Sequence, residues 1–219
     1  LHERLSSGLV LLPSNDESAA NYPDNTYRFR QDSTFLYFFG LNRPKTVGVL
    51  DLDSGEDILY GDDTSLEEII WTGPQPSLTE LAYRVGIEHT QPISHLYKRI
   101  EAAAAKGRRV HYLPPYRAET TLHISRLLGL MPDRVGAHAS TELARTIVAL
   151  REVKAPCEIE EIEYACGIAT RMHRQAMRMC RPGASEREIA GAIEGIALQY
   201  GAGVSFPSIV TQNGQTLHN

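Results

Sequence analysis

The stretch that decides the fold is TVGVLDLDSGEDILYG, residues 46–61. Two apolar runs flank the turn-forming triplet Asp53-Ser54-Gly55, and this pattern predicts two antiparallel strands joined by a tight hairpin. Further upstream, GLVLLP (residues 8–13) is a short apolar run bounded by Gly and Pro, and it predicts a buried strand. The first part of the chain is therefore expected to contribute a sheet.

The segment between these strands, FRQDSTFLYFFG at residues 29–40, is rich in aromatic side chains. In an extended conformation Phe35, Tyr37 and Phe39 would lie on one face, and Leu36 and Phe38 on the other. Apolar residues on both faces predict a central strand. The polar residues 14–27, with Asn, Asp and Pro, predict a loop.

Helical patterns follow the hairpin. Ser77-Leu-Thr-Glu80 is a capping box, and residues 93–105 and 116–128 have helical patterns with a strand at 109–113 between them. Strands that alternate with helices predict an α/β layer domain. We place this domain at residues 1–139.

Residues 140–219 are expected to form a second, mostly helical domain. Pro156 favours a helix start, Arg181-Pro182-Gly183 breaks that helix, and the capping box Ser185-Glu-Arg-Glu188 opens another that runs to Tyr200. A strand is expected at 208–211. One apolar stripe follows helical spacing in the first helix: Ile159, Ile162, Cys166, Ala169, Met172, His173, Ala176 and Cys180.

Composition excludes several classes of protein. The net charge of -5 gives no basic surface for nucleic acid or for an anionic membrane. No apolar run approaches the roughly 20 residues of a spanning helix, and the first residues lack the layout of a signal peptide. Three widely spaced cysteines indicate reduced thiols in a cytoplasmic protein, and we expect these thiols to be buried and inert.

The residues alone offer no strong catalytic motif. The glutamates at positions 158–163 fit a solvated helix N-terminus. No aspartate follows Asp133, and the three later histidines have no metal-ligand spacing, so the helical part predicts no metal site. Trp71, expected in a loop, could be a core residue or line a pocket. Spacing alone favours a structural or surface role for His218.

Four segments, in order along the chain, resemble the Xaa-Pro aminopeptidase family, the pita-bread metallopeptidases that include prolidase. FRQDSTFLYFFG is similar to its F-R-Q-x-S-x-F-x-Y-x-x-G signature. The others are Leu150-Arg-Glu-Val-Lys154 with Glu158-Ile159, then Arg181-Pro-Gly-Ala-Ser-Glu186, and finally Ile209-Val210, Gly214 and Leu217-His218. Asn219 stands where the family commonly has Tyr.

The resemblance implies a fold and a reaction. The expected fold is a mixed α/β creatinase-type domain followed by the first helices of a pita-bread α+β catalytic domain. The implied reaction is hydrolysis of the N-terminal Xaa-Pro bond of peptides with proline in second position, by an enzyme that forms a dimer or tetramer. A dipeptidase, or a non-catalytic homologue that binds peptides or proteins, remains as an alternative.

The resemblance also implies site residues. His218 corresponds to the histidine that contacts substrate beside two divalent metal ions, expected to be manganese. Trp71 lies in I-W-x-G, where the family often has a tryptophan that reaches into a neighbouring subunit's site. The family's metal ligands, two Asp, one His and two Glu, all follow the motif of His218. We therefore expect no metal ligand in this chain, which would be truncated before them, and no activity from it alone.

Overall fold

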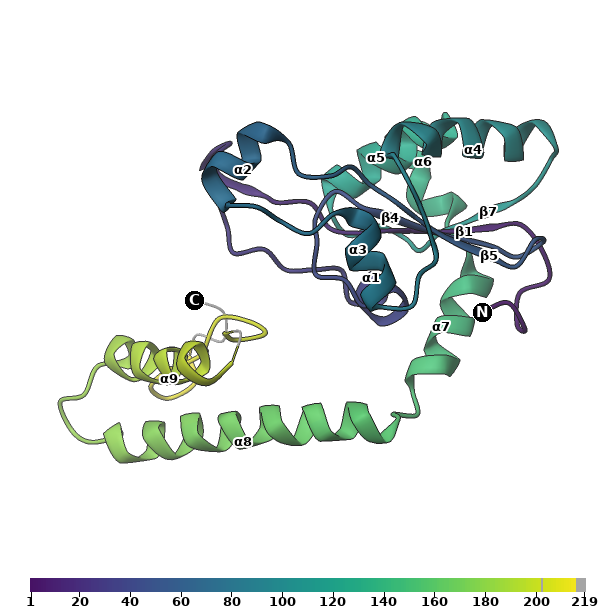
Figure 1. Cartoon of the computed structure of the whole chain (residues 1–219). Helices are drawn as coiled ribbons and strands as arrows, with labels where there is room; N and C mark the ends of the chain where they lie inside the picture. The colour runs from purple at the N-terminus through teal and green to yellow at the C-terminus, as the bar shows by residue number, and fades with distance from the viewer. Residues whose placement is uncertain (202, 216–219) are drawn as a thin grey trace. The chain divides into compact units, whose positions relative to one another are not determined.

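The computed structural model describes residues 1–201 and 203–215. It divides into two compact units, Leu1–Arg151 and Glu152–Asn219 (Figure 1). In the described ranges, no helix is both long enough and apolar enough to cross a membrane.

The first unit is built on a five-stranded mixed sheet with the order β6-β5-β4-β1-β7. Its strands are β1 (Leu9–Pro13), β4 (Val47–Asp51), β5 (Glu56–Tyr60), β6 (His89–Gln91) and β7 (Val110–His111). Strands β4 and β5 form the predicted hairpin, in which Val49 pairs with Ile58. Strand β1 runs antiparallel to β4 and parallel to β7, while β5 and β6 are parallel.

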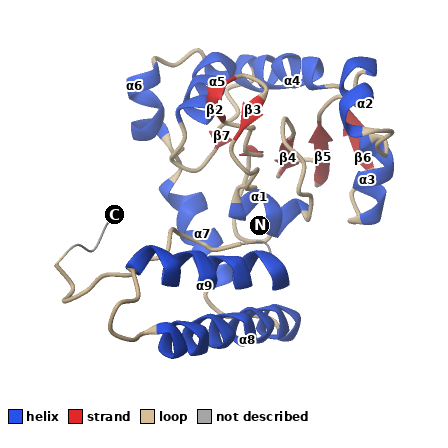
Figure 2. Cartoon of the chain, turned by 90° about the vertical axis from the view of Figure 1, so that its left-hand side faces the viewer, coloured by secondary structure: helices blue, strands red, loops and turns tan. Residues whose placement is uncertain are grey.

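Helices cover both faces of this sheet, as Figures 1 and 2 show. Strand β1 explains why, because Leu9 and Leu11 belong to one buried cluster whereas Val10 and Leu12 belong to another. One cluster is completed by α4 (Ile93–Ala105), α5 (Ala118–Leu128) and α6 (Pro132–Val135), and the other by α1 (Ser33–Phe39), α3 (Leu78–Arg84) and α7 (Thr141–Arg151). The 3₁₀ turn η1 (Gly136–His138) joins α6 to α7. The α/β layer prediction is confirmed.

The predicted central strand at residues 29–40 is wrong, because this segment forms the helix α1. The Asp32 carboxylate accepts hydrogen bonds from the backbone N–H groups of Thr34 and Phe35, at 2.9 and 2.8 Å, and so caps the helix start. Gly40 ends the helix in the left-handed conformation, with φ of 63°. Phe35 and Phe39, four residues apart, then stack on the buried side with ring centroids 5.2 Å apart.

The polar segment before α1 is also more ordered than expected. It holds a small antiparallel pair, β2 (Ala19–Tyr22) and β3 (Asn25–Thr26), where the sequence predicted a loop. The side chains of β2 are all exposed, so backbone pairing defines this hairpin and not the burial of apolar surface.

Helix α7 packs as part of the first unit. Its Leu143 and Ile147 side chains, 0% and 5% exposed, belong to the cluster on the α1 side of the sheet. The hydroxyl of Ser140 caps the helix by accepting the Leu143 N–H at 3.2 Å. The compact unit therefore ends at Arg151, later than the expected domain limit at residue 139. The position of the boundary between the two family domains stays a prediction.

The second unit consists of α8 (Pro156–Met179) and α9 (Glu186–Tyr200), both beginning where the sequence predicted. In the part of the chain that the structure describes, α8 buries no side chain. Cys157, Cys166 and Cys180 are all exposed, which contradicts the expectation of buried thiols. Residues 208–211 are not a strand, and the Ser208 N–H instead donates to Glu194 at 2.9 Å.

Candidate functional site

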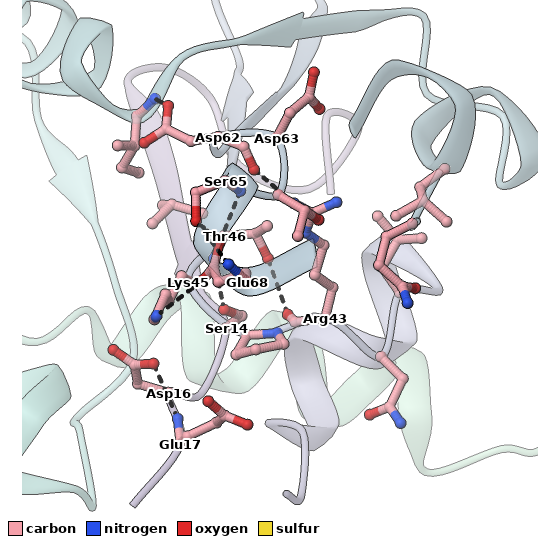
Figure 3. A pocket seen from close by; sticks show the side chains of 18 of the residues that line it. Ser14, Asp16, Glu17, Arg43, Lys45, Thr46, Asp62, Asp63, Ser65 and Glu68 are labelled. Atoms are coloured by element: carbon pink, nitrogen blue, oxygen red, sulfur yellow. Dashed lines mark hydrogen bonds and ion pairs between the residues drawn. The ribbon is translucent and has the colours of Figure 1, made fainter. Parts of the chain in front are cut away.

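The first unit has a groove of about 1120 Å³ beside helix α2 (Leu66–Thr72). Its lining comes from segments next to β1, β4 and β5 and from the α5 side chains Glu119, Thr120 and His123. Figure 3 shows how the side chains around it converge from separate parts of the sequence. The sequence alone could not assemble this groove, because no motif connects those segments.

Carboxylates dominate the charged lining of the groove: Asp16, Glu17, Asp62, Asp63, Glu67, Glu68 and Glu119, against the cations Arg43 and Lys45. Two of these carboxylates accept hydrogen bonds from the first N–H groups of other helices. Asp63 accepts the Leu78 N–H at the start of α3, at 2.6 Å, and Asp62 accepts the Ile93 N–H at the start of α4, at 3.1 Å. Their negative charge therefore stabilises two helix N-termini.

Helix α2 is capped in the same manner. Glu68 accepts from the Ser65 backbone N–H at 2.9 Å, and its own N–H donates to the Ser65 hydroxyl at 3.2 Å. The hydrogen bonds from Ser65 lower the pKa of Glu68, and the nearby charge of Lys45 acts in the same direction. Lys45 Nζ lies 3.7 Å from Glu68 Oε1, as the dashed line in Figure 3 marks.

Trp71 lies within α2 and not in the expected loop. Its side chain is 84% exposed, so the core reading for this lone tryptophan is wrong. Leu66 and Ile70 are also exposed, at 83% and 80%. The helix signal was present in the sequence, because Ser65-Leu-Glu-Glu68 has the same capping-box pattern as Ser77-Leu-Thr-Glu80.

A second charged cluster lies at the β4–β5 turn, and sequence reasoning missed it. Asp51 is 2% exposed and pairs with both Arg99 and Arg108, while Arg108 also pairs with Asp53. Burial raises the pKa of Asp51, but hydrogen bonds from Arg108 and from the backbone of Ser54 and Asp53 outweigh it, and the pKa falls to about 2. This cluster joins β4 to the segment before β7 and presents no free nucleophile.

Two histidines of the first unit have their ring nitrogens shielded to different extents, since His111 is buried and His123 is partly buried. His111 is 3% exposed, with Nε2 3.2 Å from the Ser7 carbonyl oxygen and Nδ1 2.8 Å from the Ser140 hydroxyl. A carbonyl can only accept, so Nε2 donates and the neutral ring accepts the hydroxyl proton at Nδ1. Burial lowers the pKa values of both His111 and His123, and His123 Nε2 has no hydrogen-bond partner among the described atoms.

The residues needed for a metal centre do not come together in the described ranges. No group of three or more His, Cys, Asp or Glu side chains there could hold a metal ion. His218, the expected catalytic residue, lies outside the described residues. Of the two predicted site residues, the structure therefore places only Trp71.

Comparisons with known proteins agree with this architecture. The family model for the aminopeptidase P N-terminal domain matches residues 1–112, and the model for metallopeptidase family M24 matches residues 160–219. The chain belongs to the Xaa-Pro aminopeptidase family. The expected order, an N-terminal α/β domain and then the start of the catalytic domain, is confirmed.

Individual relatives are distant and longer. Xaa-Pro aminopeptidase of Escherichia coli is 25% identical over 100% of this chain and 52% of its own length. Human Xaa-Pro dipeptidase is 24% identical over 86% of this chain and 38% of its length. The chain thus spans about half or less of these curated relatives.

Solved structures support the fold. Aminopeptidase PepP of Pseudomonas aeruginosa has a TM-score of 0.73 at 23% identity, over 92% of this chain and 47% of that one. Zinc-substituted E. coli aminopeptidase P in complex with product has a TM-score of 0.72 at 23% identity, over 92% and 48%.

Proposed function

We propose that this chain is the N-terminal part of a metal-dependent hydrolase that removes the residue before a proline at a peptide N-terminus. The observation that carries this proposal is the pair of family matches, aminopeptidase P first and M24 metallopeptidase second, in order on one chain. Relatives named Xaa-Pro aminopeptidase that match nearly the whole chain support the same reaction.

The metal ions belong to the proposal and not to the described residues. Two divalent ions, expected to be manganese, would supply an activated water and polarise the scissile carbonyl when bound. The described side chains do not form a ligand set and would not hold these ions. In the proposal, ligands come from sequence beyond this chain.

Two residues of this chain would act on the substrate. The bond to proline is a tertiary amide, so it has no N–H that the site could bind through a hydrogen bond. The site must instead accommodate the apolar proline ring. The indole of Trp71, 84% exposed, offers an apolar face for this purpose in the site of a neighbouring subunit of a dimer or tetramer. His218 would stabilise the charge that develops on the carbonyl oxygen.

The test compares the 219-residue chain with the protein extended beyond Asn219, each with manganese. The substrates are a peptide with proline in second position and the same peptide with alanine there. We expect the extended protein to cleave only the proline peptide and the shorter chain to cleave neither. Cleavage by the shorter chain, or no cleavage by a metal-loaded extended protein, would overturn the proposal.

Variants of the extended protein test the two residues. Trp71→Ala should raise KM roughly tenfold, the scale of one lost aromatic contact. Tyr83→Ala is the matched control, because Tyr83 is 83% exposed on α3. His218→Ala should lower kcat by about 10² with metal content retained, the scale of a lost transition-state contact. Unchanged kinetics would remove the respective residue from the site.

A dipeptidase is the second candidate, favoured by the match to human Xaa-Pro dipeptidase. Peptide length separates the two activities, because a dipeptidase cleaves Xaa-Pro dipeptides but leaves longer Xaa-Pro peptides intact. A protein that binds these peptides and takes up no metal would instead be a non-catalytic homologue.

A further inference from the structure

Helix α2 is short and gains little stability from burial of apolar side chains. It has seven residues, and within the described structure none of its side chains is buried. Isolated helices shorter than about 12–15 residues are marginal in water. Ile69 is only partly covered, and the three other large apolar side chains of the helix are exposed. Polar contacts at the start of α2 must therefore supply much of the free energy that keeps the helix packed on the first unit.

These contacts meet at Glu68. One carboxylate oxygen, Oε2, accepts from the Ser65 N–H and hydroxyl, both at 2.9 Å, and closes the capping box. The other oxygen, Oε1, faces Lys45 Nζ at 3.7 Å. A single side chain thus both starts the helix and connects it to a different part of the domain.

The connection through Lys45 leads to the rigid sheet. The next residue, Thr46, is 2% exposed, and its N–H donates to the buried Ser14 hydroxyl at 2.9 Å. Its neighbour Val47 begins β4 and pairs with Pro13 of β1. Lys45 is therefore anchored at the edge of the core, and Figure 3 shows it beside Glu68 at the rim of the groove.

We infer that Glu68 is a positioning residue for Trp71. It fixes the start of α2 against Lys45, and this contact determines the position of the Trp71 indole one turn further along the helix. A role for Trp71 in substrate binding rests on the proposed function. The positioning of α2 itself does not, and it can be measured on this chain without activity.

Trp71 supplies the probe, because it is the only tryptophan in the sequence. With excitation at wavelengths where tyrosine does not absorb, the fluorescence anisotropy of the 219-residue chain reports the local mobility of this indole on top of the tumbling of the chain, which the variants share. Glu68→Gln keeps a residue that completes a capping box but removes the negative charge that faces Lys45. Lys45→Met removes the positive charge of the same pair and leaves the capping box intact. Glu68→Ala removes both contacts. Anisotropy should fall slightly for Glu68→Gln and Lys45→Met, and furthest for Glu68→Ala.

Helix α3 provides a matched control. It has the same seven-residue length and the same capping box, with Glu80 in place of Glu68, but it buries Leu78 and Ala82. Glu80→Ala should leave Trp71 anisotropy unchanged. Hydrogen exchange at the α2 amides should become roughly fivefold faster in Glu68→Ala, the scale that one capping interaction contributes, here the N3 half of the capping box. Wild-type anisotropy in Glu68→Ala, or an equal fall in Glu80→Ala, would overturn the inference.

Kinetics of the extended protein separate this inference from the proposed function. If Trp71→Ala raises KM, Glu68→Ala should raise it in the same direction, with Glu68→Gln intermediate. A raised KM in Trp71→Ala with none in Glu68→Ala refutes positioning. Faster exchange in Glu68→Ala with unchanged KM in both variants upholds positioning and removes Trp71 from the substrate site.

Discussion

Replacing Asp51 by asparagine should destabilise the first unit by roughly 2 kcal/mol at neutral pH. The carboxylate is buried and paired with Arg99 and Arg108, and its pKa is lowered from 3.8 to about 2. At about 1.36 kcal/mol for each pH unit, that difference gives the stated magnitude. Asparagine has nearly the shape of the protonated carboxylic acid, so Asp51→Asn should remove the same stabilising free energy that protonation of Asp51 would remove.

The sign of the pH dependence follows from the lowered pKa. The unfolded chain binds the proton at higher pH than the folded one, so this stability is complete above about pH 5 and is lost progressively as the pH falls toward 2. Wild type and Asp51→Asn should therefore converge in free energy of unfolding at acid pH.

Urea denaturation at pH 7 and at several values down to pH 2.5 measures this difference. Asp57→Asn is the matched control, because Asp57 lies on the neighbouring strand, is 42% exposed and pairs only with His2 in the described part of the chain. Its effect should stay within about 0.5 kcal/mol. An Asp51→Asn effect no larger than this control, or one that does not shrink with acid, would refute the reasoning.

Three further predictions concern packing, titration and thiols. Gly48→Ala should cost about 1–3 kcal/mol, because a Cβ there would meet the Phe39 ring at 2.0 Å, and added Phe39→Leu should recover part of it. Burial lowers the pKa of His111, so the folded protein holds the neutral ring and loses stability as the pH falls below 6.5. In His111→Gln the free energy of unfolding should fall less steeply below pH 6.5, and the remaining fall should come from His123, whose pKa is also lowered. A maleimide should label Cys157 and Cys166 in α8, and Cys180 at its C-cap, without denaturant, and protection of any one would contradict its exposure.

Sequence patterns predicted the parts of the fold that depend on long or repeated signals. The β4–β5 hairpin has two apolar runs around a turn, and α4, α8 and α9 extend over several helical turns. The prediction for the segment that forms α1 was wrong because seven residues contain too few repeats of the hydrophobic pattern to distinguish a helix from a strand. There Asp32 and Gly40 cap the ends, and this local chemistry outweighs the strand preference of the aromatic residues.

The candidate site was less accessible to sequence reasoning. The groove and the Asp51 cluster join residues far apart in the chain, as with Asp51 and Arg108, and no local pattern encodes such contacts. Trp71 was singled out as a possible substrate-binding residue, and that role stays a prediction. Its exposure could not be predicted, because α2 packs on the domain without a buried face. The thiols were misjudged because average burial of cysteine does not report the surroundings of a particular helix.

The position of β1 between β4 and β7 also constrains how the first unit folds. Strands β4 and β5 are adjacent in sequence and can pair early, whereas Leu9 of β1 pairs with Val110 about a hundred residues later. Closing such a long loop delays the parallel pairing and slows folding. Until β7 arrives, the apolar run of β1 has one unpaired edge, which makes these N-terminal residues the segment most prone to intermolecular pairing and aggregation during refolding.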